Sequence, residues 1–232
     1  ASQFVPSYTG DPLMQIYLGS RIVAQELSAV LQDSTSRAAN EALKRLWRNQ
    51  DINHAPTVIV VLMAPALVNA SPDQLRLQAQ LLRGKINVLS DACGTPVRVR
   101  ICLTYMDRIR GYTDFARFLY KNRLPLELDV GAEAGTDLAE GLHAFERHLP
   151  RALTTIGLSS FESIVEFLRG SEQLLTPLTH FIQALSEGSA ASRRPEVQRI
   201  YFSTLSADEQ VGNPFEPPRV QRGALLGWFL AR

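Results

Sequence analysis

Hydrophobic and polar positions alternate in patterns that predict strands and helices in turn along the chain. Residues 15–18 and 21–27 indicate two strands around a Gly19-Ser20 turn, which predicts an antiparallel hairpin. Residues 57–63 are a continuous β-branched run, typical of a strand covered on both faces in a parallel sheet. Further strands are expected at 97–103 and 197–204, with an edge strand at 126–128.

Apolar residues near a 3.6-residue period predict helices between these strands. Helices are expected from the caps at 34–36 to about residue 49, from Ser71 to Gly94, at 112–122 and at 136–149. A longer helical stretch is expected at 159–186, with a break or bend near Pro177, and a flexible loop at 188–192. This order indicates right-handed βαβ crossovers.

The expected organisation is a single α/β domain over residues 1–232. Residues 15–125 and 197–204 should form the sheet, and residues 136–187 a helical insertion or subdomain. Residues 212–232 are interpreted as a C-terminal docking tail that carries an apolar cluster, Trp228, Phe229 and Leu230. This cluster either completes the core or, if exposed, forms a helix that docks on another protein, because Trp and Phe anchor many interfaces.

Composition narrows the classes of function. The 232 residues are 45% hydrophobic and carry a net charge of +1, which gives no field that would gather nucleic acid. No apolar run approaches the roughly 20 residues that a membrane span needs. Cys93 and Cys102 suit reduced cytoplasmic thiols better than a disulfide. The four histidines do not converge as metal ligands, so no metal is expected.

The most informative segment is Thr104-x-x-Asp107, which follows a strand and precedes Gly111-Tyr112-x-x-Phe115. In a GTPase-type fold an Asp at this place accepts hydrogen bonds from guanine, and a Lys two residues earlier packs along the base. Here Tyr105 stands where that Lys would be. Asp107 is therefore either a base-reading residue or a cap for the following helix. The phosphate loop Gly-x-x-x-x-Gly-Lys-Ser/Thr does not occur in the sequence.

The order of these segments resembles the cytoplasmic GTPase-like domain of the TssM/IcmF family, loosely over residues 15–215. The resemblance rests on the hairpin, Leu43-x-x-Leu46-Trp47-Arg48, the strand at 58–63, the Thr104 and Gly111 segments, Phe161-x-x-x-Val165-x-Phe167-Leu168 and the strand at 199–204. It implies a three-layer, P-loop NTPase-type fold with a mostly parallel sheet. It also implies a cytoplasmic part of an inner-membrane scaffold in type VI or type IVB secretion, held at the membrane through partner subunits or the parent polypeptide.

Two departures from the family pattern remove nucleotide chemistry. Tyr105 breaks the expected Thr-Lys-x-Asp element, and Glu26-Leu27-Ser28-Ala29 stands where an Asp-Thr-Ala-Gly switch is expected. Ala29 hinders the backbone approach that Gly allows, and Glu26 is one methylene longer than the Asp that contacts magnesium through water. Glu26 is otherwise interpreted as a solvent-facing strand residue.

The absent phosphate loop also predicts a gap in the sheet. The resemblance places the strand that would lead into this loop between the strands at 57–63 and 97–103. Without it, either these two strands pair directly or an upstream segment of a longer polypeptide fills the slot, because a central gap would leave buried backbone groups unpaired.

Two functions follow from these observations. One is a non-catalytic, GTPase-like scaffold module that binds other protein subunits and needs no cofactor. The other is the distal part of a nucleotide switch that binds GTP and Mg²⁺, with its P-loop on an upstream segment or another chain. In that case Thr104 and Asp107 would read the base, and Glu26, Ser28 and Ala29 would lie at the switch.

Overall fold

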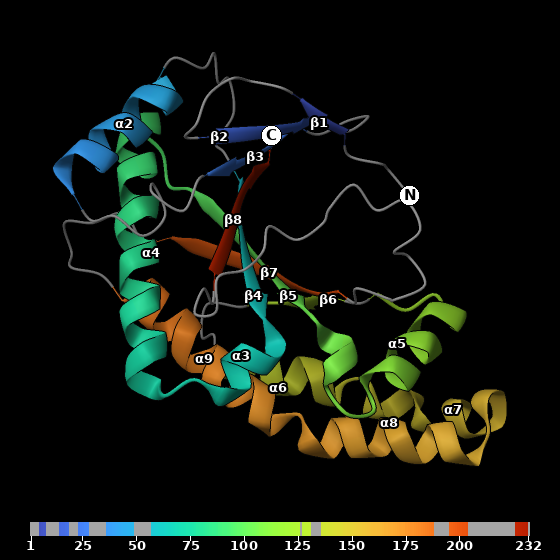
Figure 1. Cartoon of the computed structure of the whole chain (residues 1–232). Helices are drawn as coiled ribbons and strands as arrows, with labels where there is room; N and C mark the ends of the chain where they lie inside the picture. The colour runs from blue at the N-terminus through green and yellow to red at the C-terminus, as the bar shows by residue number, and fades with distance from the viewer. Residues whose placement is uncertain are drawn as a thin grey trace.

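One sheet organises the molecule, and its strands follow the order β1-β2-β3-β8-β4-β5-β7-β6 (Figure 1). This computed structural model describes residues 5–7, 14–18, 23–27, 36–48, 57–125, 127–130, 136–187, 195–203 and 226–231. Within these residues the strands are β1 Val5–Ser7, β2 Met14–Leu18, β3 Val23–Leu27, β4 Thr57–Met63, β5 Arg98–Thr104, β6 Glu127–Asp129, β7 Glu196–Phe202 and β8 Leu226–Ala231.

Four of these strands form an α/β unit of mostly parallel strands. β4 pairs with β5, and β5 with β7, in parallel, while β6 pairs antiparallel to β7 at the sheet edge. The strands expected at 57–63, 97–103, 126–128 and 197–204 are therefore confirmed to within two residues. The predicted hairpin is confirmed as well, because β2 and β3 pair antiparallel from Met14 opposite Leu27 to Leu18 opposite Val23.

The gap expected between the strands at 57–63 and 97–103 is closed by direct pairing. β4 and β5 stay in register along their whole length, from Thr57 opposite Arg98 to Met63 opposite Thr104. Of the two alternatives at this position, direct pairing is the one that the structure adopts. The reason is that two extended parallel strands satisfy each other's backbone groups without a third segment.

The C-terminal apolar segment forms a strand, so its interpretation as a helix is wrong. β8 lies between β3 and β4 and pairs antiparallel to both, with Phe229 opposite Glu26 on one side and Ile59 on the other. Trp228 and Leu230 lie on the same strand, opposite Val60 and Val58 of β4. This position in the middle of the sheet is marked by the dark red arrow in Figure 1.

The helices of the described residues are α2 Arg37–Arg48, α3 Ala64–Asn69, α4 Pro72–Cys93, α5 Tyr112–Lys121, α6 Thr136–His143, α7 Leu149–Ile156, α8 Leu158–Gly170 and α9 Glu172–Ser186, with 3-10 turns η1 Met106–Arg108 and η2 Glu146–His148. α2, α4 and α5 confirm the sequence prediction. Ser71 caps α4 in a capping box with Gln74, and Gly94 ends α4 at φ +72°.

Two helical predictions need correction. The stretch at 136–149 is not continuous, because α6 ends at His143 and η2 and α7 follow it. The stretch at 159–186 breaks at Ser171, whereas Pro177 lies inside α9. The Ser171 N–H and hydroxyl both donate to the Leu168 carbonyl, at 3.3 and 2.6 Å, and so close the last turn of α8. The loop expected at 188–192 lies outside the described residues.

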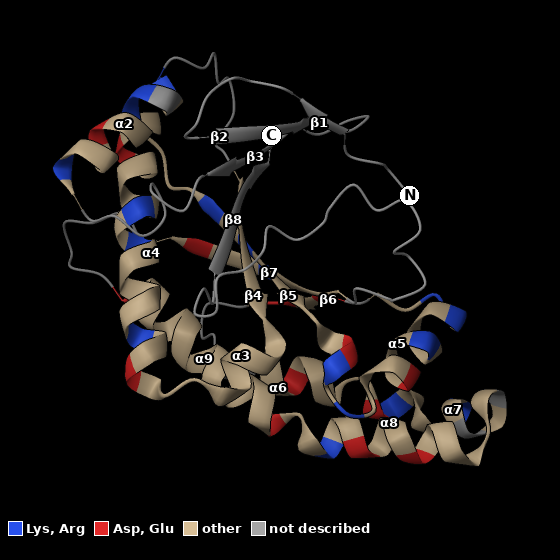
Figure 2. Cartoon of the chain, viewed as in Figure 1, with Lys and Arg blue, Asp and Glu red and all other residues tan. Residues whose placement is uncertain are grey.

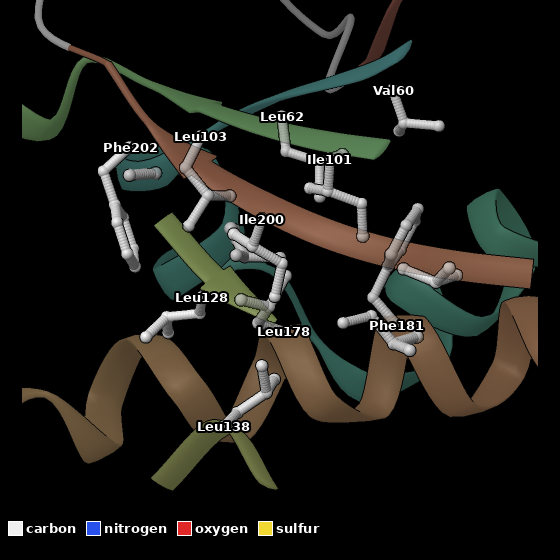
Figure 3. Packing of buried hydrophobic residues seen from close by; sticks show 14 of the residues in the cluster. Val60, Leu62, Ile101, Leu103, Leu128, Leu138, Leu178, Phe181, Ile200 and Phe202 are labelled. Atoms are coloured by element: carbon white, nitrogen blue, oxygen red, sulfur yellow. The ribbon is translucent and has the colours of Figure 1, made fainter. Parts of the chain in front are cut away.

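The core lies between one face of the sheet and the helices. Val60 and Leu62 of β4 point toward Phe181 of α9, beside Ile101 of β5 and Ile200 of β7 (Figure 3). These strand residues are buried, whereas their neighbours along β4 alternate with them and are half-buried. β4 was expected to be covered on both faces; in the structure one face is buried and the other is half-buried.

Candidate functional site

The turn after β5 lies at the carboxyl edge of the parallel strands, where α/β folds place their ligand sites. The Thr104 hydroxyl donates to the Leu62 carbonyl at 3.2 Å, which ties the ends of β5 and β4 together. The Met106 N–H donates to the Ser203 carbonyl at 3.3 Å and ties the turn to the end of β7. The sequence-predicted turn is thus held by all three parallel strands.

Tyr105 adopts a left-handed conformation, with φ +56° and ψ +32°. It is half-buried and directly precedes the 3-10 turn η1. A non-glycine residue in this region is uncommon and costs roughly 1–2 kcal/mol, so the surrounding packing must hold it there. The residue at the position of the expected lysine therefore has a left-handed backbone conformation that side chains disfavour.

Asp107 lies within η1 and is partly shielded, with 28% of its side chain exposed. Its Oδ2 is 3.6 Å from Nε of the neighbouring Arg108, a long ion pair with an exposed partner. Its Oδ1 is shielded from solvent and has no hydrogen-bond partner among the described residues. Side chains cap neither η1 nor α5, so the alternative interpretation of Asp107 as a helix cap is wrong.

The turn is pressed against α8 through Gly111, which begins α5 at φ +78°. A Cβ atom at this position would lie 2.1 Å from the Ser163 carbonyl oxygen and 2.9 Å from the Phe167 Cβ. Only glycine fits here, because both the backbone conformation and the contact exclude a side chain. No sequence signal separates this glycine from an ordinary turn glycine.

An aromatic cluster surrounds this contact. The rings of Tyr112 and Phe167 meet edge to face at 5.5 Å, and the rings of Phe115 and Phe167 are tilted by 33° at 4.8 Å. Phe202, from the end of β7, lies 6.3 Å from Tyr112. Burial raises the pKa of the Tyr112 hydroxyl well above its ordinary range, and the negative charge of Asp107 adds to the shift. The cluster fixes the orientation of the Asp107 turn relative to α8.

Glu26, the switch-like residue that the structure describes, is not brought to this turn. Glu26 lies on β3 at the level of Ile59, whereas Thr104 lies opposite Met63 at the end of β4. Three strand spacings of about 4.8 Å and four residues of about 3.3 Å separate the Glu26 and Thr104 backbones, roughly 20 Å in all. Ser28 and Ala29 lie outside the described residues.

Other candidate chemistry is structural. His143 Nδ1 and Glu146 Oε1 are 2.9 Å apart on the surface. Cys93 and Cys102 are free thiols. No group of three His, Cys, Asp or Glu side chains in the described part of the chain is arranged to hold a metal ion. Basic and acidic side chains are interspersed on the described helices (Figure 2).

The comparison with protein families identifies the chain. A model of the IcmF-related N-terminal domain matches residues 40–224, so the chain belongs to the IcmF-related family. This confirms the resemblance drawn from the sequence and associates the chain with type VI and type IVB secretion. No curated protein and no solved structure matched the chain. Among the described helices, none is both long and apolar enough to cross a bilayer.

Proposed function

We propose that this domain is a non-catalytic, GTPase-like docking module of a secretion machine, and that it binds other protein subunits on the cytoplasmic side of the inner membrane. The observation that carries the proposal is the turn after β5. Its fold is maintained by three strand ends and by the Gly111 contact with α8, while Tyr105 replaces the lysine that would pack on a base. A turn that packing holds in place, but that lacks the lysine for a base, supports a role in binding proteins over one in binding nucleotide.

The residues that would bind the phosphates of a nucleotide support the same proposal. Phosphoryl transfer depends almost wholly on positioning and charge neutralisation by the phosphate loop, its lysine and Mg²⁺. These 232 residues contain no such loop. In addition, Glu26 lies about 20 Å from the Thr104 turn by strand geometry. Hydrolysis by this chain alone is therefore not expected, and no cofactor is proposed.

One observation favours a second function, the distal part of a GTP switch. Asp107 Oδ1 is shielded and has no hydrogen-bond partner among the described residues, and an orphaned buried acceptor normally reflects a missing donor. A guanine ring offers two N–H donors to a carboxylate. In this second proposal, Thr104 and Asp107 bind the base, and GTP and Mg²⁺ complete their site with a P-loop from an upstream segment or another chain.

Thermal unfolding with millimolar GTP, GDP or ATP in Mg²⁺ separates the two functions. A ligand that binds only the folded chain at 100 times its Kd stabilises the fold by about 2.7 kcal/mol. The docking module predicts no shift of Tm with any nucleotide. A rise of Tm with guanine nucleotides alone contradicts it and favours the switch.

Asp107→Asn is the matched variant for this measurement. It keeps the size of the side chain but replaces one carboxylate oxygen with an amide donor. Under the switch it removes a guanine-dependent rise of Tm, whereas under the docking module wild type and variant respond identically to nucleotide. Copurification of the chain with other secretion subunits should then be unchanged by the variant.

A further inference from the structure

The sheet has a second face that the core does not use. Its members alternate with the core residues along β4, β5 and β7, and we define it by Ile59, Val61, Met63, Arg100, Cys102 and Tyr201. All six residues are half-buried. None of the apolar ones belongs to the core or packs against it. α9, whose Phe181 packs with the core residues of these strands, lies on the core side of the sheet (Figure 3).

Parallel strands are normally covered on both faces, because helices pack on each side of the sheet. The continuous β-branched run of β4 has the composition of such a strand, with apolar side chains on both of its faces. The apolar side chains of its second face pack on none of the described core residues. The difference between the two faces shows where a further helix or strand can pack. The charged side chains on the second face indicate the charge of that further element.

Arg100 and Arg199 are directly opposite each other on β5 and β7. Arg199 is neutralised by two carboxylates of β6, Glu127 at 3.1 Å and Asp129 at 3.0 Å. Arg100 has no counterpart among the described residues, and its Nε is shielded from solvent without a hydrogen-bond partner. A shielded guanidinium N–H normally binds an acceptor, and a carboxylate is the acceptor that matches its geometry.

We propose that an amphipathic helix of another protein subunit docks on the second face and pairs a carboxylate with Arg100. The apolar side of the helix covers Ile59, Val61 and Met63, and its Asp or Glu lies at the border of that apolar side. Arg98, exposed on the same side of β5, adds to the positive charge that selects an acidic helix. This inference rests on the proposed docking function and names the class of its partner.

Two synthetic peptides test the inference on the whole chain. Both are 18-residue helices with the same leucine face, and they differ in one border residue, Glu or Lys. Fluorescence anisotropy of the labelled peptides should show the Glu peptide binding at least 10-fold more tightly than the Lys peptide. Arg100→Glu should reverse this preference, and Val61→Ser should weaken both peptides about equally, because it reduces only the apolar contact.

Controls separate charge from folding. Lys121→Glu makes the same charge change on an exposed residue of α5 and should leave both affinities unchanged. Arg100→Gln removes the charge but keeps a polar side chain that can donate a hydrogen bond, so it should make the two peptides bind equally. Circular dichroism and Tm show whether each variant folds. If Arg100→Glu does not fold, the binding of the two peptides to Arg100→Gln decides the test.

Three outcomes overturn the inference. The first is equal binding of the two peptides to wild type, and the second is a preference that survives Arg100→Glu. The third is self-association of the chain that Val61→Ser abolishes, because it assigns the second face to another copy. If neither peptide binds while secretion subunits still copurify with the chain, the inference fails and the docking function stands. A guanine-specific rise of Tm overturns the proposed function without deciding the peptide result.

Discussion

The pKa of the Cys102 thiol depends on the burial of this side chain in the sheet. It lies on the second face of β5, between Arg100 and Thr104, and burial raises its pKa from 9.0 to about 11. The neutral thiol is therefore the form that the folded chain favours. Sequence spacing had indicated only that Cys102 is a strand residue that forms no disulfide.

This pKa predicts a loss of stability at alkaline pH. The pKa of the thiol is higher in the folded than in the unfolded chain, so its contribution is complete below about pH 9 and is lost as pH rises toward 11. Urea unfolding at pH 8, 10 and 11 should show that the wild type loses roughly 2 kcal/mol more than Cys102→Ser. Serine does not titrate in this range, so other groups cancel in the comparison. Parallel pH profiles would contradict the prediction.

At the scale of elements, α5 and α8 approach each other closely at a glycine. Gly111 allows the backbone of one helix to approach the Ser163 carbonyl of the other, and the rings of Tyr112, Phe115 and Phe167 fill the space around it. The turn that carries Asp107 is therefore positioned by α8, a helix that begins at Leu158, about 50 residues after Gly111.

Gly111→Ala is expected to destabilise the fold by about 3 kcal/mol or more, because backbone strain and a clash with backbone add together. Gly94→Ala is the matched control. Gly94 also has a positive φ, of +72°, but a Cβ there meets nothing within 4 Å, so only strain of about 1–2 kcal/mol is expected. Chemical denaturation of both variants measures the difference. Equal losses would show that the contact with α8 does not constrain the turn.

At the scale of the whole molecule, β8 joins two parts of the sheet. On one side it pairs with β3 of the N-terminal hairpin, and on the other with β4 of the parallel strands. The chain ends are thus built into one sheet that also carries the Asp107 turn. Trp228, Phe229 and Leu230 enter this sheet as strand residues, while their role in docking stays a prediction.

Removal of residues 226–232 tests the importance of β8. The backbone groups of β3 and β4 that face β8 would lose their partners, and open strand edges favour pairing with other chains. The shortened chain is expected to show faster amide exchange in β4 and to self-associate in sedimentation experiments. A monomeric shortened chain with unchanged exchange in β4 would contradict the pairing.

The candidate site was predictable only in part, for reasons seen in particular residues. Thr104 and Asp107 were found because a strand followed by a turn and a helix is a local pattern. The hydrogen bond from Thr104 to Leu62 and the close approach of Gly111 to Ser163 were not predictable, since they join segments 42 and about 50 residues apart. The shielded Arg100 likewise depends on the neighbouring strands.

The sequence by itself determined the elements that depend on local chemistry: the β-branched strand β4, the capped helix α4, the hairpin β2–β3 and the membership of the family. The tertiary structure alone decided that β4 pairs directly with β5, that β8 enters between β3 and β4, and that Ser171 separates α8 from α9. The physical reason is that period and propensity act over a few residues. Strand order, by contrast, depends on which distant segments can satisfy the same backbone groups.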